Sequence, residues 1–143
     1  MQKKVVLVIN GPNLNMLGRR NKDHYGIKTL ADIEQMIKEY DFFEYSFFQS
    51  NHEGAIIDRI QELNYDAIII NAGAYTHTSI AIHDALEIFE GPKIEVHLSD
   101  VDNREDFRKV NYIRSVCMHT ITNLKEQGYI EAVKYLQKYY DMI

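Results

Sequence analysis

An α/β fold built on a parallel β-sheet is predicted by three observations. Short apolar runs rich in valine and isoleucine recur along the chain, small or polar turn residues follow each run, and the stretches between them repeat apolar residues at helical spacing. Runs of this kind are typical of strands buried on both faces, and their alternation with helices implies right-handed crossovers. A chain of 143 residues with 45% hydrophobic and 26% charged residues fits one globular domain with its own core.

The first half of the chain supplies two strands and two helices. Val5–Ile9 is a β-branched run that a Gly-Pro pair ends abruptly. Thr29–Tyr40 repeats its apolar residues on one helical stripe, which predicts an amphipathic helix. Phe43–Gln49 is the next strand, and Ser50-Asn51 then caps a helix predicted over Glu53–Leu63.

The second half continues the alternation. In order, we predict a strand, a helix, a strand, a short helical turn, a strand and a final helix at Ala67–Ile70, Ser79–Phe89, Lys93–Leu98, Arg104–Val110, Val116–Ile121 and Gly128–Tyr140. Five strands alternating with helices over residues 1–143 predict a single-domain, doubly wound, flavodoxin-like five-stranded parallel sheet with helices on both faces.

Composition excludes several classes of function. The formal net charge of -5 argues against nucleic acid, whose recognition needs a basic face. No apolar run approaches the length of a membrane span, so we expect no membrane partner. The single cysteine, Cys117, cannot form an internal disulfide and fits a reducing, cytoplasmic setting. Because it sits in an apolar run, we expect a buried structural thiol rather than a nucleophile.

Polar residues follow four of the predicted strands, where ligands bind in open α/β sheets. Any one of them is explained by turn chemistry, but the four sets together, with two histidines, exceed what turns need. The sets are Asn10-Gly11-Pro12-Asn13, Gln49-Ser50-Asn51-His52-Glu53, Asn71 through Ser79, and His97-Leu98-Ser99-Asp100. The sequence therefore predicts a polar crevice at this edge of the sheet.

A long polar loop after the first strand carries Arg19, Arg20 and Tyr25 before any helical pattern resumes. Loops of this length are often binding loops or lids, and residues 19–26 are the segment we expect to move. An arginine beside a tyrosine favours the phenolate, which can act as a base. A plain solvated loop explains this segment equally well when it is considered alone.

Common ligands of this fold lack their signatures. There is neither a G-x-G-x-x-G motif after the first strand nor a P-loop, and Asn71 stands where a phosphoacceptor aspartate would end the third strand. His77 and His83 are spaced wrongly to share a helix face, so no metal site is expected. We expect His52 to help cap a helix, and His119 to lie in the core or at a sheet edge.

The quoted segments together resemble type II 3-dehydroquinate dehydratase, end to end and in order. They are GPNLNMLGRR followed by YG, FFQSNHEG, INAGAYTHTS, EVHLSDVDNREDFR and a late GY. The resemblance implies a hydro-lyase that converts 3-dehydroquinate to 3-dehydroshikimate with no metal or organic cofactor. It also implies a homo-oligomer in which trimers assemble into a dodecamer, a tetramer of trimers. The same step serves aromatic biosynthesis and quinate breakdown, and the sequence does not choose between them.

The resemblance also assigns roles at matching positions. Tyr25 would remove the proton next to the ketone, with Arg20 as the cation beside it. Asn13 would hold a water against the enolate oxygen. His97 would protonate the departing hydroxyl, and Glu95, two residues earlier on the same strand face, would orient its ring.

Further positions match the family's substrate-binding residues. The backbone of Leu98 and Ser99 would hold the substrate carboxylate, while Asn71, His77 and Arg108 would bind the ring hydroxyls. Two other matches, Asp84 and Arg104, carry less definite roles. Asp84 would approach a neighbouring subunit's site, although an ordinary exposed helix carboxylate explains it as well. Arg104 would lie near the site, contact the lid or contact another subunit.

One departure affects the lid, and two other functions stay open. Asn21-Lys22-Asp23-His24 replaces a Glu-Pro segment common in the family, and the missing proline should make the loop more mobile. A noncatalytic module that binds a small polyol or nucleotide is one alternative. An enzyme of related enolisation chemistry on another hydroxy-ketone acid is the other.

Overall fold

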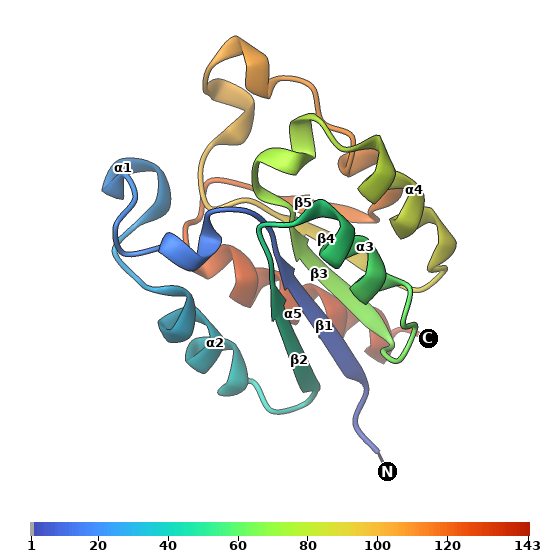
Figure 1. Cartoon of the computed structure of the whole chain (residues 1–143). Coiled ribbons are helices and arrows are strands. Elements are labelled where there is room, and N and C mark those ends of the chain that lie inside the picture. Colours follow the sequence, from blue (N-terminus) through green and yellow to red (C-terminus); the bar gives the residue numbers. More distant parts are fainter. Residues whose placement is uncertain (1) are drawn as a thin grey trace.

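The computed structural model describes residues 2–143 and confirms the predicted parallel sheet. Its strands have the spatial order β2-β1-β3-β4-β5, every neighbouring pair is parallel, and helices lie on both faces (Figure 1). This is the flavodoxin-like order. In it the ligand crevice lies between β1 and β3, where the order in which strands are added to the sheet reverses. The strands are β1 (Val5–Asn10), β2 (Glu44–Gln49), β3 (Ala67–Asn71), β4 (Lys93–Val96) and β5 (His119–Ile121).

Two of the helices begin at side chains that cap them. Thr29 and Asp32 form a reciprocal capping box, with nitrogen–oxygen distances of 3.0 and 3.1 Å. Ser79 Oγ accepts a hydrogen bond from Ile82 N at 2.9 Å. The helices are α1 (Lys22–Tyr25), α2 (Leu30–Lys38), α3 (Glu53–Ile60), α4 (Ile80–Ile88) and α5 (Gln127–Asp141). Over residues 2–143, none has the length and apolar character needed to cross a bilayer.

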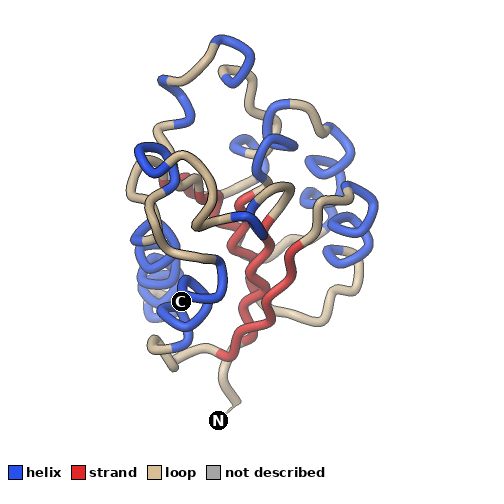
Figure 2. Tube along the Cα trace, turned by 60° about the vertical axis from the view of Figure 1, so that its left-hand side comes forward, coloured by secondary structure: helices blue, strands red, loops and turns tan. Residues whose placement is uncertain are grey.

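The hydrophobic core consists of two layers, one on each face of the sheet. Each layer lies between the strands and the helices on that side, which Figure 2 shows in red and blue. Side chains alternate along a strand, so Val6 and Val8 face the layer that contains α2 and α5, whereas Leu7 and Ile9 face the layer that contains α3 and α4. All four are fully buried. Burial of each such side chain contributes about 1.5–3 kcal/mol, and the two layers together hold the carboxyl ends of the strands in fixed positions.

Two strand boundaries differ from the sequence-based prediction by more than one residue. β4 ends at Val96, so His97 and Leu98 lie just beyond the strand rather than inside it. β5 begins at His119, because residues Arg114–Val116 form a 3-10 turn. The expected helical turn before it is also a 3-10 turn, at Asp106–Arg108. In each case an apolar run continues past the point where backbone pairing to the neighbouring strand stops.

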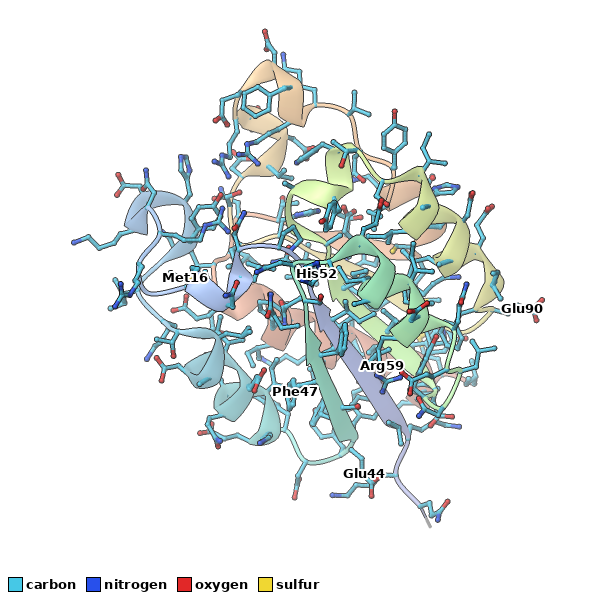
Figure 3. All side chains as sticks on the ribbon, in the orientation of Figure 1. Met16, Glu44, Phe47, His52, Arg59 and Glu90 are labelled. Atoms are coloured by element: carbon cyan, nitrogen blue, oxygen red, sulfur yellow. The ribbon has the colours of Figure 1, made fainter. Side chains whose placement is uncertain are left out.

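Three side chains with expected structural roles can now be placed. His52 occupies the residue before α3 (Figure 3), but within the described chain its side chain makes no capping hydrogen bond, so that prediction was wrong. His119 is exposed on the edge strand β5 and stacks on Tyr135 with ring centroids 4.3 Å apart. Cys117 precedes β5, and burial raises the pKa of its thiol to about 12, in keeping with a structural role.

The buried hydroxyl of Tyr129 connects the carboxyl ends of β1 and β3 through hydrogen bonds to Asn10 and Asn71. The strand register pairs Asn10 with Asn71. Tyr129 of α5, which is fully buried, donates to Asn10 Oδ1 and accepts from Asn71 Nδ2 at 3.1 Å. Asn71 Oδ1 in turn accepts from Gly73 N at 3.1 Å. These bonds fix which way the Asn71 amide faces.

Replacing Tyr129 with phenylalanine should therefore destabilise the fold. The change removes the phenol partner of two buried amide atoms, Asn10 Oδ1 and Asn71 Nδ2, and we expect the free energy of unfolding to fall by about 1–3 kcal/mol. Urea denaturation compared with Tyr139→Phe, a partly exposed position on the same helix, measures the difference. Equal losses in the two variants would contradict the buried network.

Candidate active site

A polar cavity lies at the carboxyl ends of β1, β3 and β4. Loops from well-separated parts of the chain contribute to its wall. It contains every residue that the sequence proposed for catalysis or binding except Asp84 and Glu95. The lining residues are Pro12, Asn13, Leu14, Arg20, Tyr25, Asn71, Gly73, Ala74, His77, His97, Leu98, Ser99, Val101, Arg104 and Arg108.

Tyr25 is brought into the cavity by α1, a short helix in the segment that the sequence predicts to be a loop. Asn21 caps this helix by accepting from Asp23 N at 2.8 Å. Gly26 then ends it with φ of +76°, a backbone conformation that glycine adopts without strain. The Tyr25 side chain is only 9% exposed, so the helix presents the phenol to the cavity rather than to solvent.

Two guanidinium groups donate to the Tyr25 hydroxyl. Arg20 Nη2 lies 2.8 Å from the phenolic oxygen and Arg104 Nη1 lies 2.6 Å from it. The Arg20 guanidinium also stacks over the ring, 3.7 Å from its centroid. Both contacts favour a negative charge on that oxygen. The sequence predicted the Arg20 contact but left the role of Arg104 open among three possibilities. Arg19, the exposed neighbour of Arg20, lies outside the cavity wall.

The cavity concentrates positive charge. Partial burial lowers the pKa of Arg20 from its ordinary value, the contact with Tyr25 opposes this, and the charges of Arg104 and Arg108 lower the pKa further. Cations so close to one another repel unless an anion lies between them. The arrangement therefore suits a ligand that carries or develops negative charge.

His97 and Glu95 form a buried pair at the end of β4. They are 5% and 0% exposed, and His97 Nε2 lies 2.5 Å from Glu95 Oε2. Burial raises the pKa of the Glu95 carboxyl, but hydrogen bonds from His97, Thr120 and Asn111 and the attraction of His97 lower it below its ordinary value. The carboxylate lies behind the imidazole and orients it, leaving Nδ1 as the ring nitrogen without this bond.

Amide and imidazole groups complete the wall. Asn13 has φ of +70°, a conformation asparagine tolerates, and its backbone N donates to Asn51 Oδ1 at 3.0 Å. His77 Nδ1 donates to Val110 O at 2.7 Å, which leaves Nε2 free of that bond. Burial lowers the pKa of His77 below its ordinary value, which disfavours the charged form of the ring.

The segment after β4 brings two backbone units and two arginines together. The carbonyls of Leu98 and Ser99 each accept from the loop before α5, from Lys125 N and Asn123 N, both at 3.0 Å. Arg104 Nη1 lies 3.3 Å from Ser99 Oγ. Arg108 lines the same wall and is held by Glu105 at 2.9 Å.

Asp84 lies apart from this cavity, exposed on α4. Its carboxylate shares a small surface cluster with His83 and Glu87, whose potential ligand atoms lie within 4.8 Å of one another. Exposed clusters of this kind are ordinary on helices, and His83 Nδ1 is already engaged with Tyr112 O at 2.6 Å. The fold therefore does not bring Asp84 into the site of its own chain.

Sequence reasoning missed the groups behind the histidine. Asn111 and Thr120 each contact Glu95 at 2.7 Å, yet neither belongs to a motif, and Thr120 lies in a run that was predicted only as a strand. A usable signal existed in Glu95 itself, since a carboxylate inside an apolar strand needs donors. The sequence does not say which residues supply them.

Comparison with known proteins gives consistent matches along the chain. Residues 4–137 match the family model described as "Dehydroquinase class II". The chain is 48% identical over 136 residues to the 3-dehydroquinate dehydratase of Thermotoga neapolitana, covering 93% of this chain and 94% of the relative. It is 50% identical over 144 residues to that of Fusobacterium nucleatum, covering 95% and 98%.

Solved structures agree with these matches. The crystal structure of a type II dehydroquinase from Butyrivibrio crossotus superimposes with a TM-score of 0.91 at 47% identity, covering 94% of this chain and 98% of that one. A type II dehydroquinase from Propionibacterium acnes gives a TM-score of 0.89 at 35% identity, covering 94% and 97%.

The lowered pKa of Glu95 predicts a pH-dependent contribution to stability. Because the folded-state pKa lies below the unfolded value, this stabilisation is present above the ordinary carboxyl pKa of 4.5 and is lost as pH falls through the folded-state pKa. Glu95→Gln should lower the free energy of unfolding by about 2 kcal/mol at pH 7 and by less near pH 3. Urea denaturation at both pH values, with the exposed Glu131→Gln as control, measures this; a loss independent of pH would contradict it.

Proposed function

The chain belongs to the dehydroquinase class II family, whose hydro-lyase reaction is the dehydration of 3-dehydroquinate, and we propose that Tyr25 and His97 carry its two proton transfers. One observation carries this proposal. A phenol hydrogen-bonded by two guanidinium groups lines the same cavity as an imidazole backed by a buried carboxylate. Loss of water across a bond next to a ketone needs a base and an acid in such a pair of positions.

Tyr25 acts as the base in this proposal. Its phenolate takes the proton from the carbon next to the ketone, and the C–H electrons move to form an enolate. Tyrosine is a weak acid, with an ordinary pKa of about 10, so the phenolate needs nearby positive charge. Arg20 and Arg104 supply it at 2.8 and 2.6 Å.

The enolate oxygen then needs a polar partner that does not compete for the proton. Asn13 lines the cavity and would hold a water molecule against that oxygen, as the family resemblance implies. A neutral amide can polarise such a water without protonating the base. The cationic character of the cavity favours the same developing negative charge.

His97 acts as the acid. Glu95 holds Nε2 and favours the charged imidazolium, so the proton for the leaving hydroxyl would come from Nδ1. The enolate reforms the ketone as the carbon–oxygen bond breaks, giving the conjugated enone and one water molecule. Transfer of a proton from Tyr25 back to His97 through solvent restores both groups. These steps need no metal or organic cofactor.

The remaining wall groups would bind the substrate. The backbone N–H groups of Leu98 and Ser99 would hold its carboxylate, with their carbonyls already engaged elsewhere. Asn71, His77 and Arg108 would bind the ring hydroxyls, and analogues without those hydroxyls would leave buried groups unpaired. The segment 19–26 would act as the lid that brings Arg20 and Tyr25 over the substrate.

Asp84 is proposed to act in the cavity of a neighbouring copy. It is exposed on α4 and lies outside the cavity of its own chain. This role requires a homo-oligomer, and the family resemblance implies a dodecamer built as a tetramer of trimers.

Tyr25→Phe tests the base directly. Removing the phenolic oxygen should lower kcat by roughly 100- to 10,000-fold, while substrate binding changes much less because the ring stays in place. The assay follows the ultraviolet absorbance of the enone formed from 3-dehydroquinate by EDTA-treated protein. Near-normal turnover in this variant would sink the assignment of Tyr25, and inactive wild-type protein of correct fold would sink the reaction itself.

Arg20 and Arg19 form a matched pair for testing the cation. Arg20→Ala removes a guanidinium that contacts the Tyr25 hydroxyl, and we expect kcat to fall by roughly 100-fold. Arg19→Ala removes the same charge from an exposed neighbour outside the cavity and should leave kcat within about twofold of wild type. Equal effects would mean that net charge, rather than contact with the phenol, matters.

A further inference from the structure

Three consecutive residues, Val110–Tyr112, contact two histidine rings and the carboxylate that holds a third histidine, His97. Val110 O accepts from His77 and Tyr112 O accepts from His83. Asn111 Nδ2 donates at 2.7 Å to Glu95 Oε2, the same oxygen that contacts His97. The segment is itself tied down, because Tyr112 N donates to Thr76 O at 2.8 Å.

We propose that Asn111 is a positioning residue for the proton donor His97 and acts through Glu95. The inference rests on the proposed role of His97 as the acid. Asn111 does not line the cavity, so its effect on the reaction would pass through the carboxylate and not through the substrate.

The direction of the Asn111 amide is fixed by the backbone. Its Oδ1 accepts from Ile113 N at 2.8 Å and from Arg114 N at 2.9 Å. Both partners are donors, so this end must be the oxygen and the opposite end must be the NH₂ group. The NH₂ group therefore faces Glu95, and only an asparagine-like side chain satisfies both ends.

The donors around Glu95 serve both carboxylate oxygens. Oε1 accepts from Thr120 at 2.7 Å and lies 3.6 Å from Arg114 Nε, while Oε2 receives Asn111 and His97. A carboxylate supplied in this way stays ionised and cannot rotate away from the imidazole. Without Asn111, Oε2 would depend on His97 alone, and the ring would lose its fixed direction.

The charged and titratable groups near this carboxylate come from several elements. His97 and His77 face it from the cavity, and Cys117 faces it from the segment before β5. Arg114 faces it from the turn before β5 and is also paired with Asp102 at 3.2 Å.

Asn111→Asp removes the donor selectively. The new side chain keeps an oxygen for the two backbone N–H groups, but it places a second carboxyl group against Glu95. Two carboxyl groups this close share one proton, and at low pH that proton restores a donor to Oε2. The expected result is a kcat roughly tenfold or more below wild type at pH 8, with KM nearly unchanged and the ratio to wild type recovering toward pH 5.

Asn111→Ser and Asn103→Asp complete the test. The serine hydroxyl can accept from the turn but cannot reach Glu95, so its kcat should fall at every pH with no recovery. Asn103 donates to the Asp100 carboxylate at 2.8 Å on an exposed turn. Asn103→Asp therefore removes the same kind of amide–carboxylate hydrogen bond as Asn111→Asp and adds the same negative charge, but not at the Glu95 carboxylate that contacts His97. We expect this control to follow wild type.

The outcomes separate the two proposals. If wild-type protein does not dehydrate 3-dehydroquinate, the proposed function fails. If it does, and Asn111→Asp tracks Asn103→Asp at every pH or Asn111→Ser keeps full kcat, the positioning role is overturned. Thermal unfolding of each variant checks that the fold is retained, and Asn111→Ser carries the test should Asn111→Asp unfold.

Discussion

The buried carboxylate of Glu95 is the charge around which much of this structure is arranged. A carboxylate with no exposed surface needs donors, since an isolated charge in the core would cost several kcal/mol. Those donors come from the end of β4, from β5 and from the segment before it, in His97, Thr120 and Asn111. The requirement ties the last third of the chain to the cavity. It also explains why β5, only three residues long, has a fixed place at the sheet edge.

The opposite side of the cavity is organised by positive charge. Arg20 comes from the loop after β1 and Arg104 from the segment after β4, and they meet at the Tyr25 hydroxyl. The two arginines repel each other. Each is held in place by its hydrogen bond to the phenol between them, and Arg104 also contacts Ser99. The cavity thus has a phenol that accepts from two guanidinium groups on one wall and an imidazole bonded to a buried carboxylate on the other. This polarity suits removal and delivery of a proton.

Much of this could be read from the sequence. Periodicity predicted the strands and helices, and the rule that ligands bind at the carboxyl ends of parallel strands predicted where Asn13, Asn71, His77 and His97 would meet. The family resemblance implied that Arg20 lies beside Tyr25, and α1, a single helical turn, brings the two side chains into contact. Errors fell at element ends, as at the start of β5 and at His52, where local composition continues but hydrogen bonding to a neighbour stops.

The sequence by itself determined the parallel sheet, its two apolar layers, the family to which the chain belongs and most of the candidate residues that line the cavity, because these depend on local periodicity and on short motifs. Only the tertiary structure decided that Arg104 reaches the Tyr25 hydroxyl across 79 positions and that Asn111 reaches Glu95 across 16. Such contacts depend on how separate loops pack at one edge of the sheet. No property of the individual segments specifies that packing, because hydrogen bonds and charge pairs form between whichever groups the fold brings within reach.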